Sequence, residues 1–319
     1  MKLLIGFLAV VAAAGPLDIA AQAYPTRPIR LVVPYPAGGA GDVHARLIGQ
    51  ALSPLLGQPV VVENRAGASG NLGSDHVAKA APDGHTLLMN TTNLTIAPAF
   101  STKLPFNVLT DLAPITTSLT SQNLLVVRTS LPVKSIAELV GHAKANPGKL
   151  SFGSSGIGTP MLTMELLKML TGTDLVHVPY KGDAPAITDL MGGQIDVYAT
   201  NILALDALHR AGKVRGLAVT SRKRAASLPD VPTMDEAGIP GYELETWFGY
   251  FAPAQTPRPI IDQLNAALAR AIAQPEVQKQ MTETGSVPLT MSPEDFRKRI
   301  QADLDKFARV VKNAGIKIE

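Results

Sequence analysis

Short apolar runs rich in Val, Ile and Leu alternate along the chain with stretches in which apolar residues recur at helical spacing. The run at residues 29–33 is followed by a loop rich in Pro and Gly. A helical pattern then begins, with Val43, Leu47 and Leu52 on one face. Further strands are predicted at residues 60–62, 86–89, 122–127, 150–152, 176–180, 195–199 and 214–219. Strands that alternate with helices predict an α/β fold of parallel-dominated sheets flanked by helices.

The same order of elements begins again after residue 122, and a third region starts near Trp247. Two amphipathic helices, predicted at residues 259–273 and 293–313, follow and are expected to pack onto a sheet already built. The chain would therefore cross between two lobes twice, and two crossings make a two-strand hinge beside a cleft of the kind that binds small ligands. We expect lobe 1 to contain residues 24–122 and 252–319, and lobe 2 to contain residues 123–251.

The first twenty-three residues have the pattern of a signal peptide. Lys2 provides a positive start, residues 3–14 are almost wholly apolar, and Ala21-Gln22-Ala23 is a small-x-small cleavage site. The alternative, an uncleaved anchor, is disfavoured because the apolar stretch is shorter than the roughly twenty residues that span a bilayer. We expect a mature protein that begins near Tyr24 and is exported to the periplasm.

The composition excludes several classes of function. Cysteine is absent, which excludes a lipid-modified N-terminal Cys, thiol catalysis and Cys metal sites, so the exported protein should be freely soluble. The net charge of +3 is mild, and no basic stripe with interleaved aromatic residues is present, so nucleic acid is not an expected partner. The six histidines form no H-E-x-x-H motif and no i,i+4 pair, so no metal site is expected.

Motifs for catalysis are incomplete as well. The sequence Gly153-Ser154-Ser155-Gly156 does not satisfy G-x-S-x-G, so a serine-hydrolase elbow is not supported. Residues 39–44 begin like a dinucleotide fingerprint, but His44 stands where a third small residue is required. We expect no cofactor and no catalytic residue. An exported enzyme on the same scaffold stays the alternative function.

Three loops carry the candidate chemistry, at residues 35–42, 153–159 and 180–183. Each joins a predicted strand to a predicted helix, is rich in Gly or Ser, and ends at a credible N-cap: Asp42, Thr159 or Asp183. A helix start presents unpaired N–H groups and a partial positive charge, which together attract a carboxylate or phosphate. Hydroxyls in the second loop would add donors. The alternative is that all three loops are ordinary turns of an α/β protein.

Several longer motifs follow one another along the chain. They are Tyr24-Pro25-x-Arg27-Pro28-Ile29, Pro36-Ala37-Gly38-Gly39-x-x-Asp42, Glu63-Asn64-Arg65-x-Gly67-Ala68-x-Gly70-Asn71, Pro82-Asp83-Gly84-His85-Thr86-Leu87-Leu88, Gly153-Ser154-Ser155-Gly156-x-Gly158-Thr159, Val178-Pro179-Tyr180-Lys181-Gly182, Asp189-Leu190-Met191-Gly192-Gly193-Gln194-Ile195-Asp196, Leu228-Pro229-Asp230-Val231-Pro232-Thr233 and Trp247-Phe248-Gly249. With these motifs in this order, the sequence resembles the Bug-type (Bordetella uptake gene) solute receptors of tripartite tricarboxylate transporters. The resemblance covers essentially the whole mature chain.

The resemblance implies a two-lobed periplasmic-binding-protein fold (type II, Venus flytrap) that closes on its ligand. It also implies that a carboxylate is held largely by backbone N–H groups and hydroxyls of the loops, often with bridging waters. Carried onto this sequence, the lobe 1 contacts would be Tyr35, Ala37, Gly38, Ala68, Ser69 and Thr92, and the lobe 2 contacts would be Ser154, Ser155, Gly158, Thr159 and Asn201. The sequence departs from the family at Met161-Leu162, where His-Leu is frequent, so a more apolar pocket wall is expected.

The function expected from the residues and the resemblance is a periplasmic solute-binding protein. It would capture a dicarboxylate or an aromatic carboxylate in the cleft between the lobes. Its partners would be the membrane subunits of a tripartite tricarboxylate-type transporter, or a sensor protein, and it would act as a monomer.

Overall fold

The computed structural model describes residues 24–101, 103–155 and 158–316. Its strands are β1 (Ile29–Val33), β2 (Val60–Asn64), β3 (Thr86–Thr91), β4 (Leu112–Arg128), β5 (Ser151–Ser154), β6 (Val176–Pro179), β7 (Val197–Asn201), β8 (Val214–Val219), β9 (Glu245–Pro253) and β10 (Ser286–Pro288). Its helices are α1 (Ala40–Leu56), the 3-10 turn η1 (Ala68–Gly70), α2 (Asn71–Ala78), α3 (Asn93–Phe100), α4 (Ile136–Ala145), α5 (Thr159–Thr171), α6 (Asp183–Gly192), α7 (Ile202–Arg210), α8 (Arg258–Ile272), α9 (Pro275–Glu283) and α10 (Pro293–Asn313).

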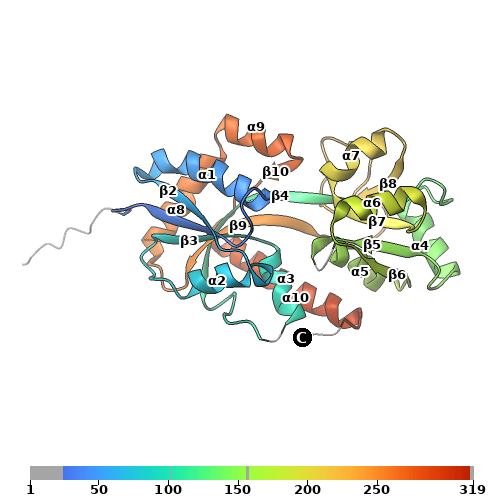
Figure 1. Cartoon of the computed structure of the whole chain (residues 1–319), viewed down its shortest axis with the longest axis horizontal. Helices are drawn as coiled ribbons and strands as arrows, with labels where there is room; N and C mark the ends of the chain where they lie inside the picture. Colours follow the sequence, from blue (N-terminus) through green and yellow to red (C-terminus); the bar gives the residue numbers. More distant parts are fainter. Residues whose placement is uncertain (1–23, 102, 156–157, 317–319) are drawn as a thin grey trace, which may run out of the picture.

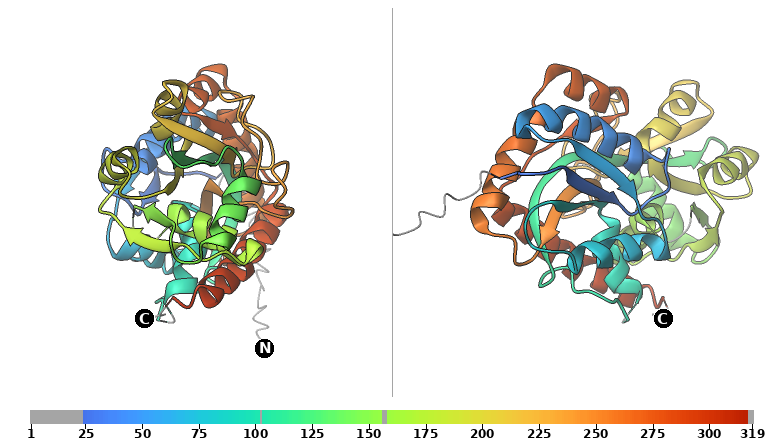
Figure 2. Two further views of the ribbon diagram at one scale, coloured as in Figure 1. Left: turned by 90° about the vertical axis from the view of Figure 1, so that its right-hand side faces the viewer. Right: turned by 60° about the vertical axis from the view of Figure 1, so that its left-hand side comes forward.

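The first sheet has the strand order β2-β1-β3-β9-β4, with β10 at the edge of β4. Because successive side chains of a strand point to opposite faces, Leu31 and Val33 pack with α1 and α8, whereas Val32 packs with α2 and α10. Both faces of the sheet are therefore covered by helices. In the right-hand view of Figure 2, α1 and α9 lie above this sheet and α2 lies below it.

The second sheet is built in the same way around the far half of β4. That half pairs with β7 and β8, and β7 continues through β5 to β6. Leu125 and Val127 pack with α4 and α5, whereas Leu124 and Val126 pack with α6 and α7. The alternation of helices and strands thus gives an α/β architecture in both halves, as expected.

The two sheets are joined by β4, a single long strand that changes its partner halfway. Gln122 is the last residue of β4 that pairs with β9, and Asn123 is the first that pairs with β7. The first expected lobe boundary, after residue 122, coincides with this change. The second, between residues 251 and 252, falls inside β9, and every paired residue of β9 belongs to the first sheet. The strand pairing favours a boundary just before Glu245 instead, and Figure 1 shows β4 and β9 running side by side between the two halves.

The sheets are mixed rather than parallel throughout. The strands of the repeating strand–helix pattern, β1 with β2 and β3, and β5 with β6 and β7, are parallel. The antiparallel pairings all include β4 or β9. These two strands run antiparallel to each other because one leaves the first sheet and the other returns to it.

A buried cluster fixes β9 at the point where it enters the first sheet. The indole of Trp247, 1% exposed, donates to Asp303 Oδ2 of α10 at 2.9 Å and packs against Phe251 and Phe296. The Trp247 amide donates to Thr92 Oγ1 at 2.8 Å, and the Trp247 carbonyl accepts from the Thr92 amide at 3.1 Å. The end of β3 and the start of β9 are therefore locked together.

The described part of the chain holds no helix that combines the length and the apolar character needed to cross a membrane.

We expect Thr92→Val to lower the free energy of unfolding by about 1–3 kcal/mol, because valine keeps the shape but leaves the buried Trp247 amide without its acceptor. Urea denaturation followed by the fluorescence of Trp247, the only tryptophan of the chain, measures this loss. Thr188→Val, at an exposed position of α6, is the control and should change stability by less than about 0.5 kcal/mol. Wild-type stability in Thr92→Val would show that this contact does not fix β9.

Candidate ligand-binding site

The candidate loops lie at the carboxyl ends of strands in both sheets, where open α/β sheets bind ligands. Loops from the two halves approach one another there. A Cβ placed on Gly158, at the start of α5, would lie 3.9 Å from Asn93 Oδ1, at the start of α3. Thr246 Oγ1 of β9 donates to Thr159 Oγ1 of α5 at 3.2 Å. The loops of the first and second sheets therefore face a common region.

The three helices that follow the candidate loops 35–42, 153–159 and 180–183 begin without a side-chain cap. The N-cap residues of α1, α5 and α6 are Gly39, Gly158 and Gly182, and none of them can supply a side-chain acceptor. The expected N-caps Asp42, Thr159 and Asp183 are wrong, because each helix begins earlier than predicted and these residues lie in its first turn. The first N–H groups of the three helices are consequently left for a ligand or for water.

Asp42 has a structural role in the first loop. Its carboxylate is buried and accepts from the Gly38 amide at 2.8 Å, from Asn64 Nδ2 at 2.9 Å and from the guanidinium of Arg46 at 2.9 Å. Hydrogen bonds from Arg46 and from the Gly38 amide lower the pKa of Asp42 to about 2. The Gly38 amide, expected to contact a ligand, is thus occupied by Asp42 in this conformation.

Tyr35 and Ala37 belong to the same loop. The hydroxyl of Tyr35 lies 2.7 Å from both Asn90 Oδ1 and Thr91 Oγ1, at the end of β3, and burial raises its pKa. Tyr35 therefore stays neutral and ties the loop after β1 to the end of β3. Ala37 is exposed, as is Gly38.

Ala68 and Ser69 sit in strained backbone between β2 and α2. Their φ angles are 46° and 55°, in the left-handed region, and they are flanked by Gly67 and Gly70, whose φ angles are 139° and 95°. Residues other than glycine adopt this region at a cost of about 1–2 kcal/mol each. Both residues are exposed. Strain held at an exposed loop in front of a helix start is typical of a ligand site.

Thr92 lies elsewhere than expected. It is fully buried, and its hydroxyl accepts from the Trp247 amide and donates to the Glu245 carbonyl at 3.3 Å. The Thr92 side chain therefore connects the end of β3 to the start of β9 and does not face the candidate site. The sequence could not reveal this, because Trp247 is 155 residues away along the chain.

The Ser-rich loop of the second sheet is also partly buried. Ser154 is fully buried, and its hydroxyl lies 2.7 Å from Nε2 of His177, whose pKa is lowered by burial. Ser155 is half-buried and hydrogen-bonds the hydroxyl of Tyr198. Gly156 and Ile157 of the same motif lie outside the described residues. Of the two serines, only Ser155 reaches the surface of the loop.

Asp183, predicted as an N-cap, instead belongs to a polar cluster with two residues of β7. Its carboxylate accepts from the Tyr198 hydroxyl at 2.5 Å and from Thr200 Oγ1 at 3.1 Å. Tyr198 and Thr200 are two residues apart on β7 and so point to the same face, which is the signal that could have indicated this cluster. Asp183 is thereby held at the start of α6.

Asn201 and Gly38, from opposite halves, border one cavity of about 530 Å³. Asn201 caps α7 by accepting from the Leu203 amide at 2.9 Å, and its Nδ2 donates to Ser121 Oγ at 2.5 Å. The cavity is also lined by residues of α1, α7, α9, β4, β9 and β10, namely Ala40, Val43, His44, Leu47, Leu119, Ser121, Leu203, Ala204, Phe248, Gln280, Met281, Thr284 and Ser286.

No charged side chain lines this cavity. His44 is 7% exposed, with Nε2 2.7 Å from Ser118 Oγ and its ring edge-on to Phe248, and burial lowers its pKa to about 3. It is therefore neutral at ordinary pH. The described residues also contain no group of three or more His, Asp and Glu side chains that could hold a metal ion.

Met161, where the sequence departs from the family pattern, is only 7% exposed and belongs to the buried face of α5. Its thioether adds no polar group to the loop in front of it.

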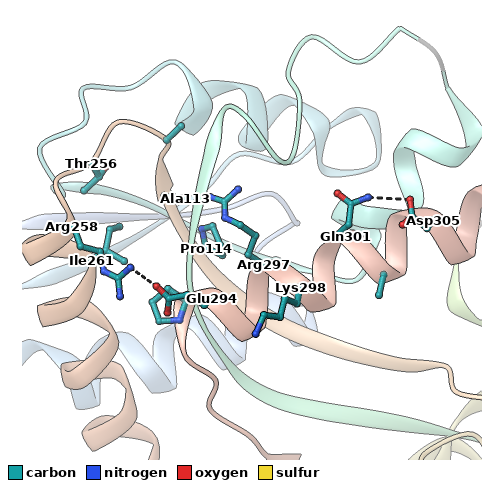
Figure 3. Close-up of a pocket in the computed structure, with 13 residues that line it drawn as sticks. Ala113, Pro114, Thr256, Arg258, Ile261, Glu294, Arg297, Lys298, Gln301 and Asp305 are labelled. Carbon is teal, nitrogen blue, oxygen red and sulfur yellow. Dashed lines mark hydrogen bonds and ion pairs between the residues drawn. The ribbon is translucent and has the colours of Figure 1, made fainter.

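A second cavity, of about 780 Å³, lies between α8 and α10, away from these loops (Figure 3). Most of its charged side chains are already paired. Arg258 bonds with Glu294 and Asp262, and Lys298 bonds with Asp295. Figure 3 also shows Gln301 bonded to Asp305. Arg297 lines the cavity as well, and its guanidinium donates to the Leu109 carbonyl at 2.9 Å. None of the candidate loops contributes to this cavity.

Comparisons with known proteins identify the family of this chain. The family described as "Tripartite tricarboxylate transporter family receptor" matches residues 44–316. The protein BugT of Bordetella pertussis is 36% identical over 316 residues, which cover 98% of this chain and 96% of that protein.

Two solved structures are similar over nearly the whole chain. The periplasmic binding protein BugD is 36% identical, with a TM-score of 0.72 and coverage of 92% of this chain and 99% of that chain. An R. palustris protein with adipate is 38% identical, with a TM-score of 0.74 and coverage of 92% and 98%. The chain belongs to the receptor family of the tripartite tricarboxylate transporters, a family of periplasmic solute-binding receptors.

Proposed function

We propose that this protein captures a small organic carboxylate between its two halves and releases it unchanged to a tripartite tricarboxylate-type transporter or to a sensor. The observation that carries the proposal is the set of three uncapped helix starts, at α1, α5 and α6, which come from both sheets. Such starts offer oriented N–H donors and a partial positive charge to an anion. The adipate in the R. palustris relative supports an organic acid as the ligand class.

The proposed contacts come mainly from the backbone. We assign them to Tyr35, Ala37, Gly38, Ala68, Ser69, Ser155, Gly158, Thr159 and Asn201. Contact through the Gly38 amide requires that this amide exchange Asp42 for the ligand. Thr92 and Ser154 are buried and would position the loops, since their hydroxyls are bonded to Trp247 and His177.

We also propose that the protein is exported and acts as a monomer. Residues 1–23 would direct export and be cleaved near Tyr24, whose hydroxyl donates to the Gly84 carbonyl at 2.6 Å and thus already belongs to the folded domain. The mature protein would act in the periplasm as a monomer, without a lipid anchor.

Catalysis is not part of the proposal. The Ser154–His177 pair has the distance of a nucleophile and its base, but Ser154 is fully buried, so a substrate cannot reach it without movement of the loop. An exported enzyme would need such a pair on the surface of the site.

A panel of organic acids should contain at least one that raises the melting temperature of the purified protein, because a ligand that binds only the folded state stabilises it. Protein unfolded and refolded before the screen removes any acid that co-purifies. If no acid in the panel raises the melting temperature of the refolded protein, the carboxylate-receptor proposal fails.

For the acid found in that screen, we expect Ser155→Ala and Thr159→Ala each to weaken binding by about 1–3 kcal/mol if the hydroxyl donates to the carboxylate. Isothermal titration calorimetry measures the change. Ser227→Ala, an exposed serine in the same half of the protein, is the matched control and should bind as the wild type does. Wild-type affinity in both site variants would remove these two hydroxyls from the site.

Affinity for the acid should be constant between about pH 6 and 8. Free carboxylic acids are already ionised there, and His44 stays neutral because its pKa is about 3. Burial also lowers the pKa of His177, which favours its neutral form. Titration calorimetry across this range tests whether peptide donors hold the ligand. Affinity that increases as the pH falls through about 6.5 would instead indicate a histidinium contact.

A further inference from the structure

The cavity between α1, α7 and α9 is lined largely by apolar side chains and reaches two residues of the proposed acid site, Gly38 and Asn201. Gly38 and Ala40 at the start of α1, and Asn201 before α7, belong to the lining. The lining also includes aliphatic and aromatic side chains, namely Val43, Leu47, Leu119, Leu203, Phe248 and Met281.

The polar side chains that line the cavity already have partners. Ser121 accepts from Asn201, His44 pairs with Ser118, and Gln280 donates to Glu276. The hydroxyl of Thr284 donates to the Met281 carbonyl. Since no Lys, Arg, Asp or Glu lines the cavity, a carboxylate inside it would be buried without a counter-charge, which is strongly unfavourable.

Two of the wall residues are large apolar side chains that face solvent. Val43 of α1 is 59% exposed and Leu203 of α7 is 49% exposed, and they come from opposite halves of the protein. A hydrocarbon group placed between them would remove both from water, which is favourable. The cavity is thus continuous with the proposed acid site at Gly38 and Asn201 and complementary to an apolar group.

We propose that this cavity binds the apolar tail of a monocarboxylic acid whose carboxylate lies beside Gly38 and Asn201, so that the protein selects acids with one charged end over dicarboxylates. The inference rests on the proposed function and specifies its ligand class. A tail of several carbons or an aromatic ring enters between α1 and α7, and its carboxylate stays with the donors at the helix starts.

Octanoate and octanedioate are a matched pair for the test, because they have the same chain length and differ in a second carboxylate. Isothermal titration calorimetry with the refolded full-length mature protein should give an affinity at least tenfold higher for octanoate. Equal affinity, or tighter binding of octanedioate, overturns the inference.

The location is tested by a variant that fills the cavity. Ala204→Phe places a ring among the lining residues and should weaken octanoate binding at least tenfold. Ala207→Phe is the matched control, since Ala207 is exposed on the same helix and is not among the lining residues, and it should bind octanoate as the wild type does. Unchanged octanoate affinity in Ala204→Phe, or an equal loss for a short acid such as acetate, overturns the inference.

The outcomes separate this inference from the proposed function. Dicarboxylates that bind while octanoate does not would leave the carboxylate receptor in place and refute only the apolar tail. A protein that binds no acid at all would refute both.

Discussion

The ladder between β4 and β9 is the constraint on which the rest of the molecule depends. Because β4 pairs with β9 up to Gln122 and with β7 from Asn123, one continuous strand belongs to both sheets. The loops that follow the parallel strands of each sheet are therefore held on facing sides of the same crossing. Trp247 and Thr92 fix the start of β9 against β3, so the position of the first half relative to the crossing is set by buried hydrogen bonds and aromatic packing.

Glycine N-caps leave the first N–H groups of three helices available to an anionic ligand. Relative to glycine, a Ser or Asp cap would stabilise a helix by only a few tenths of a kcal/mol, and it would do so by occupying the donors that an anion needs. Gly39, Gly158 and Gly182 forgo that stabilisation at three helix starts. Asp42 offsets part of this lost stability at α1. Its carboxylate, in the first turn of the helix, accepts from the Gly38 amide, and Arg46 balances its charge. The remaining donors are oriented before a ligand arrives, which lowers the cost of binding.

The sequence predicts the repeating strands and helices well because their apolar spacing is regular. It does not predict residues 112–121 of β4, where Thr116, Thr117 and Ser118 are fully buried polar residues whose hydroxyls bond to neighbouring segments. The N-caps were placed on polar side chains by their general preference, whereas glycine occupies these positions. Contacts between distant segments, such as Thr92 with Trp247, have no local signal at all. Glycine-rich loops indicate where a ligand could lie, but tertiary packing decides which hydroxyls of the loop are buried.

Backbone N–H groups and side chains have different roles in ligand recognition. The N–H groups at a helix start persist through most side-chain substitutions, so the acid end of a ligand can be held alike by many sequences with this fold. The walls of the cavity are made of side chains, and these are free to differ. In this chain the wall formed by Val43, Leu203 and Phe248 is apolar, and His44 beside it is kept neutral by burial. Discrimination among acids therefore depends on the end of the ligand that lies away from the carboxylate. A second charged group at that end would be buried without a partner, and this costs more free energy than a missing methylene group.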